Sequence, residues 1–174
     1  AVGSQAGLAA AQRGECDAAP IPLLDPATDR YNQPFLGEGL RLLRGYVRMQ
    51  GVATRAEETR EIAALLDDAS LRMVNRNRGS GTRVLIDAVL AGRRPAGFAY
   101  EPRSHYAVAA AIEQKRADWG VTIEPVARAY PKLTFHVASA PSGERLFRML
   151  RDRSIDLALG RVTLPMAEGD LTIG

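Results

Sequence analysis

The segment that most constrains this fold is a small-residue turn that joins an expected strand, residues 71–74, to an expected helix, residues 83–90. The turn reads Gly-Ser-Gly-Thr over residues 79–82 and is flanked by arginines. A strand that runs through such a turn into a helix leaves the first N–H groups of the helix without intrahelical partners. The helix dipole adds roughly half a positive charge at the same end, so the turn is suited to binding an anion.

The residues of the turn support the same function. Ser80 and Thr82 offer hydroxyl donors, while Gly79 and Gly81 let a ligand approach the backbone. The turn is not a Walker loop, because the G-x-x-x-x-G-K-[ST] spacing is absent and arginine stands where lysine is needed. An ordinary strand–helix turn, with Ser80 as the helix N-cap and solvated arginines around it, is the alternative interpretation.

The composition fits a single globular domain with a small excess of positive charge. Of the 174 residues, 46% are hydrophobic and 25% are charged. The net charge of +3 suits a small anion better than a nucleic-acid duplex, which needs a dense basic face. We find no run of about 18 apolar residues and therefore expect a cytoplasmic domain without a membrane span. The single cysteine, Cys16, excludes an internal disulfide and is expected to be a buried structural thiol.

Strand, small-residue turn and helix recur along the chain. We expect an Ala-rich helix at residues 5–14, capped by Ser4, and another at residues 104–112, capped by Ser104. This repetition predicts an α/β fold with mainly parallel sheets, in which ligands bind outside the carboxyl ends of the strands at the helix N-termini. The turns at residues 3–4, 79–82 and 103–105 are therefore the candidate anion-binding turns.

The other expected elements are less directly tied to function. They are an apolar strand at 17–24, an irregular surface segment at 25–36, a long strand at 40–52 that crosses between lobes, an amphipathic helix at 55–68 with a Thr54–Glu57 capping box, short strands at 98–100 and 118–121, and a short helix at 122–129. His105, His136 and Cys16 lack the spacing of zinc ligands, and no nucleophile–base motif is visible. We therefore expect no metal, no cofactor and no catalysis.

Several short motifs, taken in order, are similar to a known family. They lie at residues 2–8, 13–17, 23–26, 31–32, 46–51, 74–83, 104–109 and 117–120. Over roughly residues 2–135 this combination resembles the periplasmic-binding-protein-like (type 2) domain of molybdate-responsive regulators. The same domain is appended to some molybdopterin biosynthesis proteins.

The resemblance implies a two-lobed fold with an oxyanion such as molybdate or tungstate in the cleft. Ser4 would be the donor from the first lobe. The second lobe would supply the other residues of the site, which are Asn75, Arg78, Gly79, Ser80, Gly81, Thr82, Arg83, Ser104 and His105. The family usually carries a histidine where this chain has Pro22, so any ligand contact made by that histidine is lost here.

The tail of the chain is similar to a different family. Residues 130–139, 142–147 and 150–161 resemble the first segment of the effector domain of LysR-type transcription regulators. We expect residues 1–45 to form part of the first lobe, residues 46–129 to form the second lobe with hinge segments, and residues 130–174 to form an extra strand–helix–strand unit. We favour the interpretation that this unit completes the first lobe, because its apolar helix face must be buried. The alternatives are that it starts a second, truncated domain or that the chain is trimmed or chimeric.

We predict a sensor domain for a small oxyanion, belonging to a transcription regulator whose DNA-binding domain lies outside this chain. One alternative is an accessory domain of a molybdopterin biosynthesis enzyme. Another is a LysR-type effector domain in which Arg78 and Arg83 pair with the carboxylate of an organic acid. An exposed tail strand is compatible with a homodimer.

Overall fold

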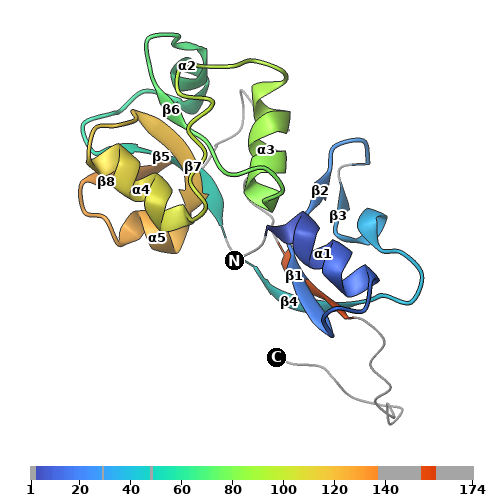
Figure 1. Ribbon diagram of the computed structural model, residues 1–174. Coiled ribbons are helices and arrows are strands. Elements are labelled where there is room, and N and C mark those ends of the chain that lie inside the picture. Colours follow the sequence, from blue (N-terminus) through green and yellow to red (C-terminus); the bar gives the residue numbers. More distant parts are fainter. Residues whose placement is uncertain (1–2, 29, 48, 137–153, 160–174) are drawn as a thin grey trace.

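The computed structural model describes residues 3–28, 30–47, 49–136 and 154–159, which form two lobes (Figure 1). The first lobe holds a sheet of strand order β1 (Ala18–Ile21), β9 (Ser154–Leu159), β4 (Arg41–Val47), with helix α1 (Ser4–Gln12) packed against it. The second lobe holds a sheet of order β6 (Met73–Val74), β7 (Trp119–Ile123), β5 (Gln50–Arg55), β8 (Leu133–His136), with helices α2 (Ile62–Asp67), α3 (Gly81–Leu90), α4 (His105–Glu113) and α5 (Glu124–Arg128).

In the first lobe, a strand from the tail lies in the middle of the sheet. Strand β9 pairs antiparallel with β1 on one side and with β4 on the other. Helix α1 covers one face, where Leu8 is buried with Ile21 and Leu23. Residues 133–136 join the sheet of the second lobe instead. The tail segments at 142–147 and 150–153 lie outside the described residues.

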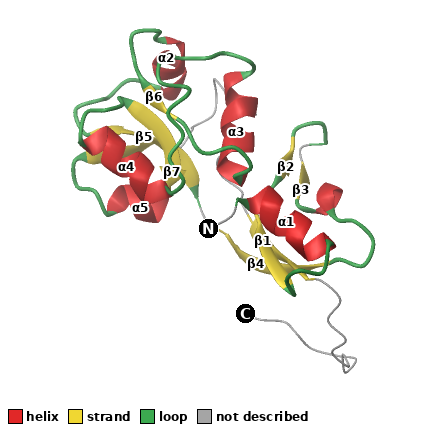
Figure 2. Cartoon of the chain, viewed as in Figure 1, coloured by secondary structure: helices red, strands yellow, loops and turns green. Residues whose placement is uncertain are grey.

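In the second lobe, helices cover both faces of the sheet (Figure 2). On one face, Leu85 and Ile86 of α3 are buried against Trp119. On the other face, Val108 and Ile112 of α4 are buried in a second apolar cluster. Each face of the second sheet is therefore covered by an apolar cluster.

The two lobes are joined by the strand that the sequence predicts to cross between them. Strands β4 and β5 are almost continuous in sequence, yet β4 belongs to the first sheet and β5 to the second. A hairpin of β2 (Leu24–Asp25) and β3 (Arg30–Tyr31), followed by the 3₁₀ helix η1 (Gln33–Phe35), occupies the segment expected to be irregular. Leu24 of this hairpin is buried together with apolar residues of α3. The hairpin therefore packs against the helix that follows the candidate turn.

The direction of the strands differs from the predicted, mainly parallel sheets. Among the described strand pairs, only β6 and β7 run parallel. Parallel neighbours need a crossover connection, and α3 and α4 provide one between β6 and β7. Strand β5 instead enters directly from the first lobe and lies antiparallel to both β7 and β8.

The amphipathic helix expected at residues 55–68 is shorter than predicted, and its capping box does not form. Only residues 62–67 are helical, because Thr54 and Arg55 belong to β5. Thr54 is fully buried and its Oγ1 lies 2.7 Å from Nε2 of His136 on β8. Pairing with two neighbouring strands thus overrides the local helix signal.

The segment 98–100, expected to be a strand, is a turn. Its backbone still holds the end of β6, because the N–H of Met73 donates to the carbonyl of Ala96 and the N–H of Asn75 donates to that of Tyr100. Gly97 between them has a φ of +81°, a left-handed conformation that a strand does not adopt. The short strand expected at 118–121 and the short helix expected at 122–129 are confirmed as β7 and α5.

Because His136 is partly buried, the stability of the second lobe is expected to depend on pH. Burial lowers the pKa of His136 from its ordinary value of 6.5, while Glu58 and Glu61 oppose this effect. The unfolded chain therefore binds this proton more tightly than the folded chain does. The contribution of His136 to stability is fully present above about pH 7 and is lost as the pH falls through 6.5 towards the lower folded value.

We expect the unfolding temperature to decrease between about pH 7 and pH 5, and to decrease less in the variant His136→Gln. Thermal unfolding of both proteins in matched buffers measures the difference. Parallel pH curves for the two proteins would rule out this contribution.

Candidate functional site

The candidate turn begins helix α3 as the sequence predicts. Ser80 is the N-cap residue, and its side chain accepts a hydrogen bond of 3.1 Å from the N–H of Arg83. Gly79 has a φ of +80°, which turns the chain sharply into the helix. Gly81 and Thr82 are the first helical residues, and the first N–H groups of an α-helix have no partner within the helix.

The N-terminus of α1 lies directly against this turn. The N–H of Gln5 donates to the carbonyl oxygen of Gly79 at 3.1 Å. Gly3 is so close that an added Cβ would stand 2.6 Å from the same oxygen. Figure 1 shows α1 and α3 meeting at this point, where the lobes adjoin. Ser4 is the first residue of α1 rather than its cap, because Gly3 occupies the N-cap position and no side chain caps this helix.

Pro22 of the first lobe also reaches the start of α3. A Cβ added to Gly81 would stand 2.1 Å from the carbonyl oxygen of Pro22. Pro22 is the position at which the resembling family usually has a histidine. In this chain the backbone carbonyl of Pro22 lies against Gly81, the first residue of α3.

Helix α4 begins beside a cluster of polar side chains. Ser104 caps it, accepting 3.0 Å from the N–H of Ala107. Nη1 of Arg76 lies 3.1 Å from Nε2 of His105, the first residue of the helix, and Arg76 is only 6% exposed. Oγ1 of Thr122, at the end of β7, lies 3.3 Å from Nδ1 of the same histidine.

A second buried polar contact ties the turn to the crossing strand. The hydroxyl of Thr82 donates to Oε1 of Gln50 at 2.8 Å, and both residues are buried. Gln50 is the first residue of β5, immediately after the chain enters the second lobe. Thr82 is therefore held by the strand that joins the two lobes.

The arginines near the turn have different surroundings. The side chain of Arg83 is 7% exposed and donates to Asp87, Glu101 and the carbonyl of Arg76 at 2.7, 2.6 and 3.1 Å. The side chain of Arg78 is 85% exposed, with its Nε 3.8 Å from Glu101. The carboxylate partners neutralise Arg83, whereas Arg78 is open to solvent.

Asn75, another residue of the expected site, holds backbone in place. Its Nδ2 donates to the carbonyl of Phe98 at 3.0 Å, and its Oδ1 accepts from the N–H of Arg76. It is fully buried. Asn75 and Arg83 together fix the segment between β6 and the turn.

Sequence reasoning left out Gln50, Arg76 and Thr122, which contact the expected site residues Thr82 and His105. A signal for two of them is visible in hindsight. Gln50 and Thr122 are polar residues at the ends of strands whose remaining residues are mostly apolar. For Arg76 the sequence gives no such signal, because its contact with His105 distinguishes it from the neighbouring arginines only in the folded structure.

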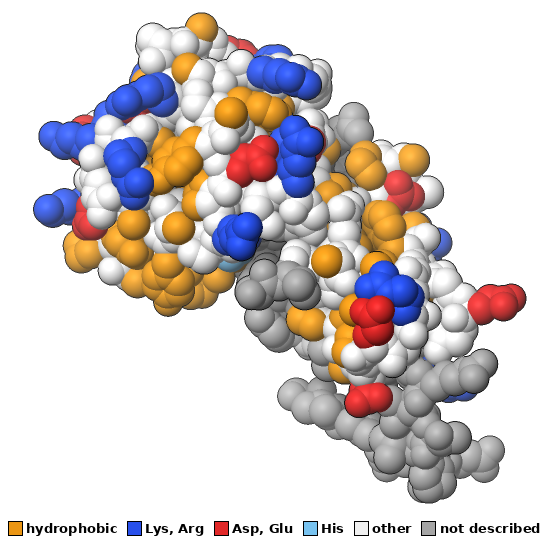
Figure 3. Space-filling view, in the orientation of Figure 1, with side chains coloured by type: hydrophobic (Ala, Val, Ile, Leu, Met, Phe, Trp, Pro, Cys, Tyr) orange, Lys and Arg blue, Asp and Glu red, His pale blue; other side chains and the backbone are white. Residues whose placement is uncertain are grey.

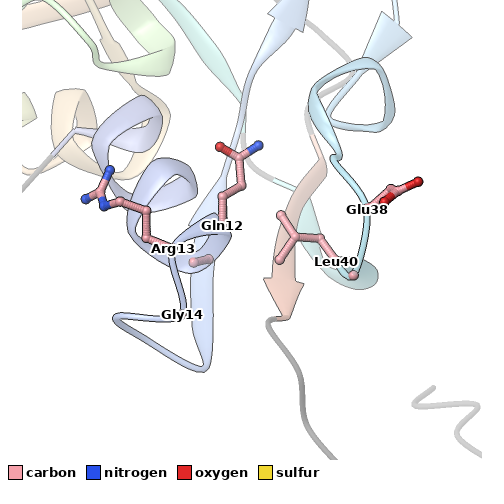
Figure 4. Close-up of a pocket in the computed structure, with 7 residues that line it drawn as sticks. Gln12, Arg13, Gly14, Glu38 and Leu40 are labelled. Carbon is pink, nitrogen blue, oxygen red and sulfur yellow. The ribbon is translucent and has the colours of Figure 1, made fainter.

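A hollow in the surface of the first lobe lies away from this site. A cavity of about 510 Å³ opens at the C-terminal end of α1, opposite the helix end that meets the turn (Figure 4). Its lining includes Arg13, which pairs with Glu15 at 2.6 Å, and the loop residues Glu38 and Leu40. None of the expected site residues lines it.

On the face in Figure 3, lysine and arginine side chains are interspersed with other types and form no continuous basic band. None of the described helices has the length and apolar character that crossing a bilayer requires. Within the same described residues, no cluster of three or more histidine, cysteine or acidic side chains is arranged to hold a metal ion.

Comparison with known proteins shows which family this chain matches. The family description "PBP superfamily domain" matches residues 1–154. The chain is also 32% identical over 121 residues to the uncharacterized protein YvgK of Bacillus subtilis (strain 168). That match covers 63% of this chain but 39% of YvgK, so the chain spans less than half of that relative.

Solved structures share the fold at low sequence identity. An ABC-type phosphate transport receptor from Vibrio cholerae superposes with a TM-score of 0.62 at 12% identity, covering 94% of this chain and 75% of the receptor. The effector-binding domain of QuiR in complex with shikimate gives 0.63 at 16%, covering 91% and 69%. The C-terminal domain of a probable LysR family transcriptional regulator from Rhodococcus sp. RHA1 gives 0.60 at 15%, covering 90% and 72%.

These likenesses confirm the predicted α/β, type 2 periplasmic-binding-protein-like fold. They also confirm the likeness to LysR effector domains at the level of the fold. The chain therefore belongs to the PBP superfamily, and it is a ligand-binding, PBP-like domain.

Proposed function

We propose that this domain binds a small oxyanion between its lobes, where the N-termini of α1 and α3 meet and α4 begins. The observation that carries the proposal is the contact between the N–H of Gln5 and the carbonyl of Gly79, which brings the first turns of two helices from different lobes together. Each helix N-terminus presents partial positive charge and first-turn N–H groups that have no partner within the helix, of which those of Gln5 and Arg83 are already bound by Gly79 and Ser80. Molybdate and tungstate are the oxyanions that the sequence resemblance implies.

The electrostatics support a small anion at this place. The charge of Arg83 is balanced by Asp87 and Glu101, while the largely exposed Arg78 and the helix ends add positive charge. Gly3 and Gly81 have no room for a Cβ because the backbone carbonyls of Gly79 and Pro22 lie against them, so these glycines let the two lobes adjoin beside the helix N-termini. The residues proposed to bind are those of the predicted site, together with Gln50, Arg76 and Thr122.

We further propose that the domain acts as a cytoplasmic sensor in a transcription regulator. An anion that contacts both lobes stabilises the arrangement in which they adjoin, and a ligand shifts an equilibrium only by such differential binding. The fold likeness to a LysR family effector domain supports this role. The DNA-binding part would belong to chain outside these 174 residues.

Thermal unfolding with a panel of ligands tests the proposal. Molybdate and tungstate are expected to raise the unfolding temperature, since a ligand at 100 times its Kd adds about 2.7 kcal/mol to stability. Sulfate and phosphate test selectivity among oxyanions, and shikimate tests the organic-acid alternative. Stabilisation by shikimate and by none of the oxyanions would favour the organic-acid alternative. An unchanged unfolding temperature with every oxyanion at millimolar concentration would contradict the proposal.

Replacement of Arg78 tests one side chain of the site with little risk to folding. Arg78→Ala is expected to weaken oxyanion binding by about tenfold, because one charge-assisted contact is worth about 1.5–3 kcal/mol at most. The unfolding temperature without ligand should hardly change, because the side chain is 85% exposed. Arg128→Ala is the matched control, since Arg128 is also exposed and pairs with Glu124 on α5. Equal affinities of the two variants would remove Arg78 from the site.

A further inference from the structure

A buried hydrogen bond in the proposed site uses the single proton of the Thr82 hydroxyl. Thr82 is the second residue of α3 and is 2% exposed, and its Oγ1 donates to Oε1 of Gln50 at 2.8 Å. A hydroxyl has one proton to donate, although its oxygen can also accept. An anion that binds at the start of α3 therefore competes with Gln50 for this proton.

The backbone on both sides of this hydrogen bond is held in place, which leaves the side chains to respond. Gln50 pairs with Ile123 in the ladder between β5 and β7. Gly81, next to Thr82, lies against the backbone carbonyl of Pro22. The carboxamide of a glutamine carries an acceptor oxygen and a donor nitrogen on one planar group. A half-turn of that group exchanges the two without moving the backbone.

Resting on the function proposed above, we propose that Gln50 takes part in anion binding through the hydroxyl of Thr82. When the oxyanion binds, the hydroxyl turns to donate to it, and the carboxamide of Gln50 makes a half-turn so that Nε2 donates to Oγ1. A hydroxyl that accepts such a bond is polarised and donates more strongly. The exchange suits molybdate and tungstate, whose oxygens carry no proton near neutral pH and can only accept.

This exchange connects the ligand to the strand that joins the lobes. Gln50 is the first residue of β5, directly after the chain enters the second lobe. Its contact with Thr82 is kept with and without the anion, with donor and acceptor reversed. Gln50 is therefore a positioning residue, which keeps Thr82 attached to the crossing strand while the hydroxyl changes its partner.

The side-chain amide signals of Gln50 in the ¹⁵N-labelled chain, identified by their loss in Gln50→Met, report the half-turn. Saturation with molybdate is expected to move one Nε2 proton downfield, because that proton becomes hydrogen-bonded to Oγ1 of Thr82. Thr82→Ser keeps the hydroxyl and should show the same movement. Thr82→Val keeps the shape of the side chain without the hydroxyl and should show none. Unmoved signals in the original chain with bound molybdate, or an equal movement in Thr82→Val, would overturn this inference.

Calorimetry with molybdate measures whether the hydroxyl reaches the anion. Thr82→Val is expected to weaken binding by about tenfold or more, the effect of one lost hydrogen bond to a charged group, while Thr82→Ser should stay within about threefold of the original chain. Equal affinities of Thr82→Val and the original chain would also overturn the inference and leave the proposed function standing. No binding of molybdate or tungstate to the original chain would instead overturn the proposed function.

Discussion

Gly81→Ala is expected to weaken oxyanion binding strongly while leaving the fold intact. The new Cβ would stand 2.1 Å from the carbonyl oxygen of Pro22 and 3.0 Å from its carbonyl carbon. Both are backbone atoms of the first lobe, so the methyl group must push the start of α3 away from that lobe. Because the proposed site needs donors from both lobes, a displacement of about 1 Å should raise the Kd by a factor of ten to a hundred.

The helix itself should tolerate this change. Alanine is better than glycine in a helix by about 1 kcal/mol, so α3 is not weakened by the substitution. Gly7→Ala is the matched control, because its Cβ would lie at an ordinary 3.6 Å from Cβ of Ala19 within the first lobe. We expect that variant to bind as the original chain does. Calorimetry with molybdate on both variants measures the contrast, and full affinity in Gly81→Ala would show that the contact between the lobes is not part of the site.

Arg83→Met is expected to lower the free energy of unfolding by about 2–4 kcal/mol, because it breaks a largely buried ion pair. Arg83 donates to Glu101 at 2.6 Å, to Asp87 at 2.7 Å and to the carbonyl of Arg76 at 3.1 Å. Its removal leaves Glu101, a partly buried carboxylate, without its nearest cation. The guanidinium also stacks 4.7 Å from the centre of the Phe98 ring, a contact that methionine replaces only in part.

Arg93→Met provides the comparison for an exposed pair. Arg93 pairs with Asp67, but the two side chains are 46% and 70% exposed. An exposed pair contributes at most about 1 kcal/mol. Urea unfolding of both variants gives the two free energies, and equal losses would show that burial of Arg83 has no energetic consequence.

Local signals in the sequence predicted the caps of α3 and α4 correctly but were wrong for α1, whose N-cap is Gly3 and not Ser4. Ser80 and Ser104 are N-caps because a short polar side chain can close the first turn of whatever helix follows it, and this needs no distant partner. The same local reasoning predicted a capping box at Thr54, and it was wrong there. Thr54 is held by β7 and β8, whose residues are far along the chain.

The partners of the site residues could not be predicted in the same way. Gln50 meets Thr82, and Arg76 meets His105, only after the strands and helices of the second lobe have assembled. Arg78 and Arg83 show the limit clearly. They are the same residue type a few positions apart, yet one side chain is 85% exposed and the other 7%. Which of them remains open to a ligand depends on the position of Glu101, which the sequence pattern does not give.

A titration of the ¹⁵N-labelled chain with molybdate, followed through the backbone amide signals, tests the proposed site most directly. We expect the largest shifts at Ser4, Gly81, Thr82 and His105, the residues that begin α1, α3 and α4. Shifts confined to the cavity near Arg13 and Leu40, or no shift at any amide at millimolar molybdate, would contradict the proposed site.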